Sequence, residues 1–309
     1  MVLNELLVLQ CLWKDPTNFI RMTCLSHIEV GNCVGLKTIF TQSIAQTLRF
    51  LETIVICDCR ELEYIIEPSD PHVEGEEESF STVAYLERLR EIRVEGCGRL
   101  KFILPLSIAQ RLPSLTKMSV KGAQQLEQLF SDDERRGRAE DKDKDIELPK
   151  LRTLELEHLF FLSSIIPAGY VIDSSCLSKL CVVSIKSCGI EDACSVYQLP
   201  CLTHLDIIEC PNLRILFRST VARAFKTLKR IKIKNCQSLD TILAQGEGHS
   251  VDEFDLIEPT CFSTLWQIEI EGCHKLKSVI PFSAAQKFMK LKKIEIKKLP
   301  KFGGHSCHG

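Results

Sequence analysis

An internal repeat runs through almost the whole chain and constrains its fold more than any other feature of the sequence. In each copy a leucine anchors the frame and apolar residues follow at plus three and plus five. Most copies add a cysteine at plus eight and a leucine at plus eleven. Ten copies keep this register, with anchors at Leu25, Leu51, Leu89, Leu115, Leu151, Leu180, Leu202, Leu228, Leu265 and Leu291. A degenerate eleventh copy fits at the start of the chain, with Leu3 as anchor and Leu6, Val8 and Cys11 in the frame.

The pattern is that of a leucine-rich repeat, in which each copy forms one short strand and a return segment. Side chains at plus three and plus five point inward, and those between them point outward. One copy cannot bury its own apolar face, but stacked copies can. We therefore expect an α/β fold, a curved solenoid with a concave parallel sheet and short helices or irregular segments on its convex side. Residues 1–302 should form this single domain, and residues 303–309 a disordered tail.

The repeat also accounts for half of the 16 cysteines, which stand at plus eight: Cys11, Cys33, Cys59, Cys97, Cys188, Cys210, Cys236 and Cys273. A thiol there is expected to be buried as a small apolar group with a weak donor. Zinc sites at Cys57 with Cys59, or at Cys307 between two tail histidines, are weaker alternatives because neither shows paired ligand spacings. Secreted disulfide scaffolds of this density are under about 80 residues long, so we expect free thiols in a reducing compartment.

Copies of 26 residues alternate with longer ones, which carry polar insertions at 67–79, 131–147 and 244–259. The insertions hold 19 acidic and five basic residues, a net charge of −14, which leaves +12 on the rest of the chain. They cannot bury enough apolar surface to fold alone, so they should be mobile loops. The 26-residue copies share a hydroxyl residue eight positions before the next anchor, interpreted as a helix N-cap or, alternatively, a phosphorylation site: Ser43, Ser107, Thr220 and Ser283.

Residues at plus one, two, four and six are expected to face the concave side, which makes them candidates for binding a partner. The candidates are Arg90, Arg93, Lys117, Lys121, Lys229, Arg230, Lys232, Lys234, Trp266 and Glu269. An exposed tryptophan beside a ladder of cations is typical of an interface anchor with steering charge around it. In the alternative interpretation Trp266 lies flat on the sheet under lysine stems, and the lysines only keep the surface soluble.

Three long segments carry a resemblance to a known family. They are 27–67 (HIEVGNCVGLKTIFTQSIAQTLRFLETIVICDCRELEYIIE), 91–110 (EIRVEGCGRLKFILPLSIAQ) and 267–286 (QIEIEGCHKLKSVIPFSAAQ), and the opening CLWKDP at 11–16 also fits. Together they resemble the C-terminal leucine-rich-repeat region of plant intracellular immune receptors of the coiled-coil, nucleotide-binding class. The resemblance implies a cytoplasmic protein that recognises a pathogen effector or a guarded host protein and restrains a nucleotide-binding domain. No G-x-x-x-x-G-K-[ST] motif is present, so we expect no bound nucleotide and no other cofactor.

Other classes of function fit less well. We expect no enzyme activity, because cysteine, histidine, aspartate and serine fall on the repeat frame or in the insertions and no catalytic motif appears. An extracellular receptor would be expected to show Asn-x-Ser/Thr acceptors, capping cysteines and a signal peptide. A ubiquitin-ligase substrate adaptor shares the plus-eight cysteines and the 26-residue period, and it stays the alternative. No nucleic-acid-binding module is recognisable, and no apolar run reaches the ~18 residues of a membrane span.

Overall fold

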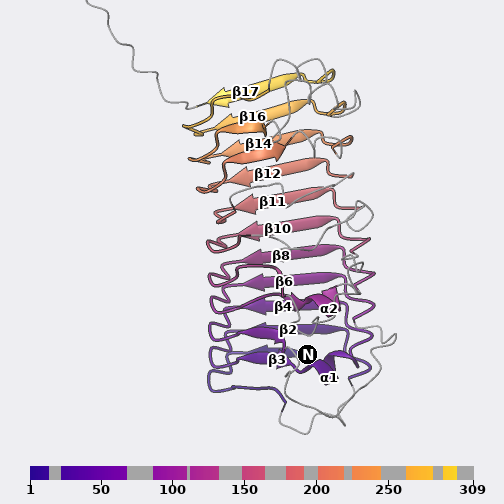
Figure 1. Cartoon of the computed structure of the whole chain (residues 1–309). Helices are drawn as coiled ribbons and strands as arrows, with labels where there is room; N and C mark the ends of the chain where they lie inside the picture. Colours follow the sequence, from indigo (N-terminus) through magenta and orange to yellow (C-terminus); the bar gives the residue numbers. More distant parts are fainter. Residues whose placement is uncertain are drawn as a thin grey trace, which may run out of the picture.

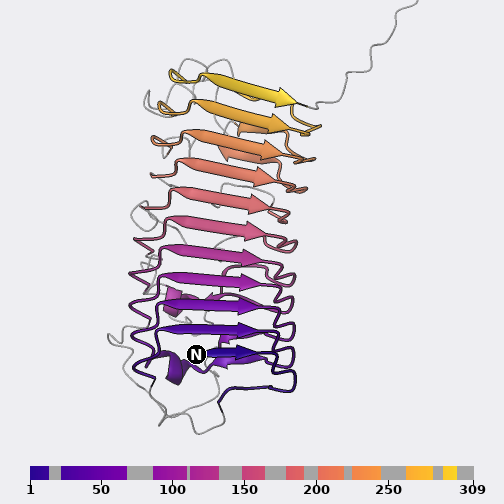
Figure 2. The same cartoon turned by 180° about the vertical axis from the view of Figure 1, so that it is seen from behind.

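The computed structural model of the chain describes residues 1–13, 22–67, 86–109, 112–131, 148–163, 179–190, 201–218, 225–244, 262–280 and 288–297. In these residues eleven parallel strands lie side by side in one sheet, which rises up the stack in sequence order (Figures 1 and 2). The predicted leucine-rich-repeat solenoid is thus confirmed. The three predicted insertions lie outside the described residues apart from their first residues, and so does the predicted tail.

From the second strand onward, each strand of the large sheet begins at plus two of its repeat and ends at plus six. The strands are β1 (Val2–Asn4), β2 (His27–Gly31), β4 (Thr53–Cys57), β6 (Glu91–Glu95), β8 (Lys117–Lys121), β10 (Thr153–Glu157), β11 (Val182–Lys186), β12 (His204–Ile208), β14 (Arg230–Lys234), β16 (Gln267–Glu271) and β17 (Lys293–Lys297). Equivalent positions pair without any shift, as Ile231 does with Ile268. The register of the ten complete copies is therefore the one that the sequence predicts.

Side chains at plus three and plus five form the core. From β2 to β16 they are at most 3% exposed, and the leucines of the return segments pack against them. In β17 the same positions hold Ile294 and Ile296, which are 49% and 40% exposed, because the described chain places no further repeat above them. Burial at these positions thus depends on a neighbour on both sides, as expected of stacked repeats.

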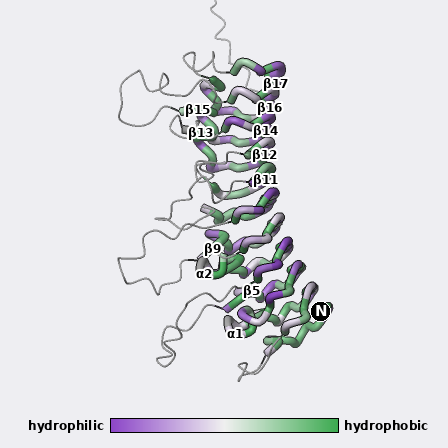
Figure 3. The backbone as a smooth tube through the Cα atoms, turned by 90° about the vertical axis from the view of Figure 1, so that its right-hand side faces the viewer, coloured by the Kyte–Doolittle hydropathy of each residue, from purple (hydrophilic) through white to green (hydrophobic). Residues whose placement is uncertain are grey.

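The small elements lie on the other side of the stack from the large sheet (Figure 3). Three pairs of short parallel strands follow the large sheet at intervals: β3 (Thr38–Phe40) with β5 (Tyr64–Ile66), β7 (Leu104–Pro105) with β9 (Phe130–Ser131), and β13 (Ile215–Arg218) with β15 (Thr241–Ala244). The helices α1 (Gln42–Ala45) and α2 (Leu106–Ala109) have four residues each. None of the helices in the described ranges is long and apolar enough to cross a bilayer.

The predicted N-caps need a correction. Ser43 and Ser107 are each the second residue of their helix rather than the residue before it. At α1 the preceding Thr41 accepts the backbone hydrogen bond of Ala45 through its carbonyl, and its hydroxyl lies 3.0 Å from that of Ser43. The helix begins earlier than the serine frame suggests, because its first turn closes on Thr41. Thr220 and Ser283 lie outside the described residues.

The frame assigned to the first copy is also wrong. Leu3 pairs with Val30, so it occupies the plus-five position of its repeat and not the anchor. Cys11 is exposed and forms an isolated bridge with Thr38, so it is not part of the plus-eight ladder. The leucine-rich start of the chain fits the repeat in two frames, and the strand pairing selects the other one. Seven buried cysteines remain at plus eight.

These seven thiols stack on consecutive repeats in two groups, Cys33, Cys59 and Cys97, then Cys188, Cys210, Cys236 and Cys273. Each thiol lies 3.2 to 3.6 Å from the carbonyl oxygen two residues before it, to which it can donate. Burial raises the pKa of the Cys188 thiol to about 11. A hydrogen bond with Cys210, followed by burial, raises the pKa of Cys236 to about 12. All seven thiols are buried small groups of the core, as predicted.

A turn that sequence analysis missed follows each strand of the large sheet from β1 to β16; the residue after β17 lies outside the described residues. The residue at plus seven has a positive φ, between 51° and 69°, in Glu5, Asn32, Asp58, Gly96, Gly122, His158, Ser187, Glu209, Asn235 and Gly272. Its N–H donates to the plus-six carbonyl of the next repeat over 2.7 to 3.0 Å. Glycine, asparagine and aspartate tolerate this left-handed conformation best. Their recurrence at plus seven was the available signal, and the bond ties each repeat to the next.

Candidate protein-binding surface

The large sheet lies on the inner side of the curved stack (Figure 3), and its outward side chains form an open surface. In β14 and β16 burial alternates along the strand, so that plus two, four and six point outward, as predicted. Plus-one residues lie just before the strands, and their N–H groups donate to the plus-one carbonyl of the preceding repeat. Arg90, Lys229 and Trp266 are therefore exposed at the edge where the strands begin, rather than on the strands themselves.

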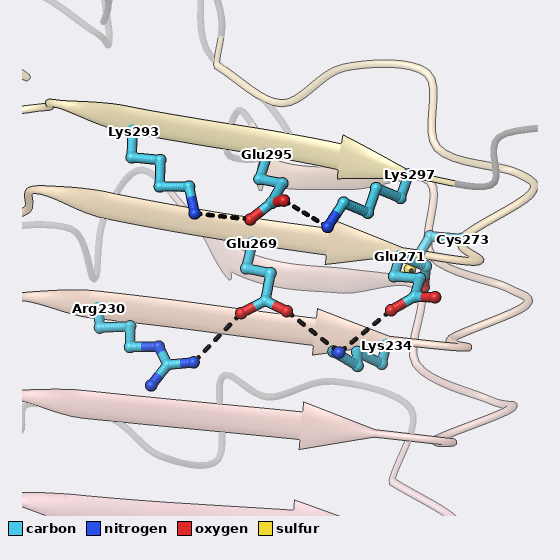
Figure 4. Close-up of polar contacts among 8 residues, drawn as sticks. All are labelled: Arg230, Lys234, Glu269, Glu271, Cys273, Lys293, Glu295 and Lys297. Carbon is cyan, nitrogen blue, oxygen red and sulfur yellow. Dashed lines mark hydrogen bonds and ion pairs between the residues drawn. The ribbon is translucent and has the colours of Figure 1, made fainter.

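The predicted basic ladder on β14 is partly neutralised by the next strand (Figure 4). Glu269 lies 3.1 Å from Arg230 and 3.1 Å from Lys234, and Lys234 also lies 3.1 Å from Glu271. Hydrogen bonds from Lys234 and then Arg230 lower the pKa of the Glu269 carboxyl, and both glutamates raise the pKa of Lys234. Arg230 and Lys234 are thus engaged by glutamates within the sheet, a pairing that sequence analysis did not address.

A second glutamate bridges two cations in the same way on the last strand. Glu295 is 2.9 Å from Lys293 and also pairs with Lys297. The two lysines, Lys297 first, lower the pKa of Glu295 to about 2. Acids at plus four and plus six of β16 and β17 therefore pair with cations on β14 and β17.

Three further cations of this surface form no ion pair with the residues that the structure describes. Within the described ranges, Lys229, Lys232 and Lys292 have no ion pair within 4.0 Å. Trp266 stands between Lys229 and Lys292 in the plus-one row, joined to each by a backbone hydrogen bond of 3.0 Å. Its side chain keeps 40% of its surface exposed. An aromatic ring with solvent access thus lies between two cations at this edge.

The other candidates lie far along the stack from this group. Lys117 and Arg93 pair with Glu91 at 3.6 and 3.5 Å, and Lys121 pairs with Glu157 at 3.4 Å. The strands β10, β11 and β12 separate them from β14. The structure therefore divides the ten candidates into two groups, one on β6 and β8 and one on β14 and β16.

The family of the chain is decided by a comparison with known proteins. A family model for plant disease resistance protein RPS2-like leucine-rich repeats matches residues 1–60 and 69–190, more than half of the chain. The chain belongs to this family. The matched part of these RPS2-like repeats ends before β12, so the charged surface of β14, β16 and β17 lies beyond it. No curated protein matches the chain.

Solved structures similar to this RPS2-like chain are also leucine-rich-repeat proteins. The leucine-rich-repeat domain of the type III effector XCV3220 (XopL) is 17% identical, with a TM-score of 0.40, covering 96% of this chain and 75% of the other. An internalin of Listeria monocytogenes is 15% identical, with a TM-score of 0.26 and coverage of 89% and 78%. A leucine-rich cell surface protein of Faecalibacterium prausnitzii is 15% identical, with a TM-score of 0.27 and coverage of 88% and 79%. At these scores they carry no argument about function.

Sequence analysis missed an aromatic pair on these RPS2-like repeats. Phe160 and Phe161, in the turn after β10, are 53% and 68% exposed, and the ring of Phe160 lies 6.2 Å from that of His158. Other copies have small or polar residues at these positions, such as Gln124 and Gln125. That contrast was the signal, and it went unused because only strand positions were considered as outward-facing.

The described part of the surface offers charged and aromatic side chains for contact with a partner. No group of three or more histidine, cysteine, aspartate or glutamate side chains in the described part of the chain is arranged to hold a metal ion. Cys57 lies at plus six with its side chain outward, whereas Cys59 is buried, so the two point to opposite sides. The histidines and cysteine of the tail lie outside the described residues.

Proposed function

We propose that the chain is the recognition region of a cytoplasmic plant immune receptor, a single domain of stacked repeats over residues 1–302. In this proposal it binds a pathogen effector or a guarded host protein and restrains the nucleotide-binding domain of its receptor, without cofactor or catalysis. The observation that carries the proposal is an open sheet of outward side chains on repeats of the RPS2-like disease resistance family. Leucine-rich repeats of this kind are protein-interaction modules.

The ion pairs of the sheet support binding to a folded protein partner. Glu269 and Glu295 each hold two cations in place, so these long side chains lose less conformational freedom when a partner covers them. Preordered side chains lower the entropic cost of association. The surface is therefore suited to contact over many strands at once.

Co-precipitation with the nucleotide-binding domain of the same receptor tests this function. The chain and that domain are expressed as separate tagged proteins, and binding is compared for the wild type and for Lys229→Glu combined with Lys232→Glu. We expect capture by the wild type and reduced capture by the double variant, because two unpaired cations are lost. Arg93→Glu, at the plus-four position of β6, is the matched control. If the wild-type chain captures neither this domain nor a purified effector or guarded protein, the proposal is wrong.

A further inference from the structure

The edge at which β14, β16 and β17 begin carries positive charge without any acid. Residues 225–230, 262–267 and 288–293 contain six cations and no aspartate or glutamate. We call the six cations with the tryptophan between them the cationic edge: Lys226, Lys229, Arg230, Trp266, Lys290, Lys292 and Lys293. The acids of these strands, Glu269, Glu271 and Glu295, stand at plus four and plus six, further along the strands. The acids are therefore confined to the later part of these strands, away from the edge where the strands begin.

The two acids that reach back toward the edge do not neutralise it. Glu269 pairs with Arg230 and Glu295 pairs with Lys293, and each also holds a second cation at plus six. Lys229 and Lys292, on either side of Trp266, have no ion pair within 4.0 Å in the described part of the chain. The free charge thus surrounds the exposed indole.

We propose that the cationic edge binds an extended acidic segment of a partner protein, with an apolar side chain of that segment against Trp266. The proposal rests on the proposed function and adds the chemistry of the partner. Neighbouring strands lie about 4.8 Å apart, so Lys229 and Lys292 are separated by about 10 Å. An extended chain advances about 3.3 Å per residue and alternates its side chains between two faces, so acids four residues apart, ~13 Å, lie on one face together with the residue midway between them. The flexible lysine stems span the remaining ~3 Å. An apolar residue between those acids meets the indole.

Charge complementarity favours this occupant over a neutral or basic one. Opposite charges across a surface steer the encounter and exclude partners of like charge, and an aromatic anchor at the centre contributes contact energy. A sulfated polyanion such as heparin would satisfy the lysines but offers no apolar side chain to contact Trp266. The two classes of partner therefore differ in their dependence on the indole.

A labelled synthetic peptide, with two acids on each side of a central leucine, tests the proposal by fluorescence anisotropy. In a Trp13→Phe background, the emission of Trp266 gives a second readout at the site itself. We expect binding that weakens about 30-fold in Lys229→Glu combined with Lys292→Glu, and about tenfold in Trp266→Ala. The preference for leucine over serine at the centre of the peptide should disappear in Trp266→Ala. Binding should also weaken with added salt.

The controls use equivalent positions elsewhere in the stack. Arg152→Glu changes the exposed plus-one residue of the β10 repeat, and Phe161→Ala removes another exposed aromatic ring; both should bind the peptide within twofold of wild type. Circular dichroism and elution volume establish that every variant is folded. Equal weakening by Arg152→Glu, or absence of peptide binding by the wild type, would overturn the proposal. So would heparin binding that matches peptide binding and is unaffected by Trp266→Ala.

The experiment separates this proposal from the proposed function. If the chain captures the nucleotide-binding domain or an effector, and that capture is unaffected by Lys229→Glu with Lys292→Glu and by Trp266→Ala, the cationic edge is not the docking site. The recognition function then stands while this inference fails. If the peptide binds as expected but no protein partner is captured, the chemistry of the edge stands and the proposed receptor role fails.

Discussion

The two ends of the stack share one backbone frame but differ in what they display where their strands begin. Around β4 and β6 this edge mixes signs, with Glu52, Glu87 and Glu91 beside Arg88 and Arg90. Arg88 there lies 4.4 Å over the ring of Phe50, so one of the cations is already used within the chain. Around β14, β16 and β17 the same positions hold six cations, a tryptophan and uncharged residues, and no acid. The difference teaches that the repeat fixes where a side chain stands and leaves its chemistry open.

Truncation of the core tests whether the two ends are structurally equivalent beneath these surfaces. Ile56→Ala and Ile233→Ala occupy plus five of β4 and β14, and both side chains are fully buried. Each should lower the free energy of unfolding by about 3 to 4 kcal/mol, because transfer and cavity terms add. Ile296→Ala, at the same position of the exposed β17, should cost less than about 1.5 kcal/mol. Urea unfolding measures all three, and a much smaller cost at Ile233 than at Ile56 would break the equivalence.

The left-handed turn provides the next largest expected effect, again with one site at each end. A Cβ at Gly96 would lie 2.3 Å from Asp58 Oδ1, and one at Gly272 would lie 2.3 Å from Asn235 Oδ1, and both glycines have φ near +70°. Gly96→Ala and Gly272→Ala should each cost about 1 to 3 kcal/mol. Gly98→Ala is the control, because nothing lies within 4 Å of its Cβ. Equal thermal stability of Gly96→Ala and Gly98→Ala would contradict the role of the turn.

The buried plus-eight cysteines allow one serine substitution from each end of the stack to be compared. Cys97→Ser and Cys236→Ser should each lower stability by about 1 to 3 kcal/mol, because a hydroxyl replaces a thiol in an apolar stack. In the native protein the plus-eight thiols should react slowly with a maleimide at pH 8, while the exposed Cys11 and Cys24 react quickly. Rapid labelling of all sixteen cysteines would rule out the buried ladder.

The pKa of the buried thiols adds a pH dependence to this prediction. The pKa of Cys188 is raised in the folded state, so its contribution to stability is complete below the ordinary value of 9.0 and is lost as the pH rises toward about 11. Urea unfolding at pH 8 and pH 10.5 should show a loss of stability at the higher pH that is smaller in Cys188→Ala. A loss of equal size in both proteins would assign it to other groups.

The smallest expected effect concerns the glutamate that neutralises β14. Glu269→Gln should change stability by less than about 1 kcal/mol, because partly exposed ion pairs contribute little. It releases Arg230 from its carboxylate partner and leaves Lys234 paired with Glu271 alone, so affinity for the acidic peptide should rise severalfold. Glu91→Gln is the control on β6. Reduced affinity in Glu269→Gln would show that removing this negative charge does not favour binding of the acidic peptide, and the charge argument would fail.

Sequence analysis predicted the core because burial and leucine spacing share one period. It did not predict which cations are neutralised, since Arg230 and Glu269 are 39 residues apart and meet only through strand register. Applied across neighbouring copies, the frame could have paired plus two of one strand with plus four of the next. The first copy was misplaced for a different reason: Leu3, Leu6 and Leu9 fit plus five, eight and eleven as well as the assigned frame fits.

The hydrogen bond of the plus-seven turn has a consequence for the evolution of such a surface. It joins the end of one strand to the end of the next, whatever length of chain separates them: 22 residues between the anchors Leu180 and Leu202, and 38 between Leu51 and Leu89. Insertions on the far side of the stack therefore leave the spacing of the sheet unchanged. A lineage can lengthen a return segment, or exchange a lysine for a glutamate on the inner face, without either change disturbing the other.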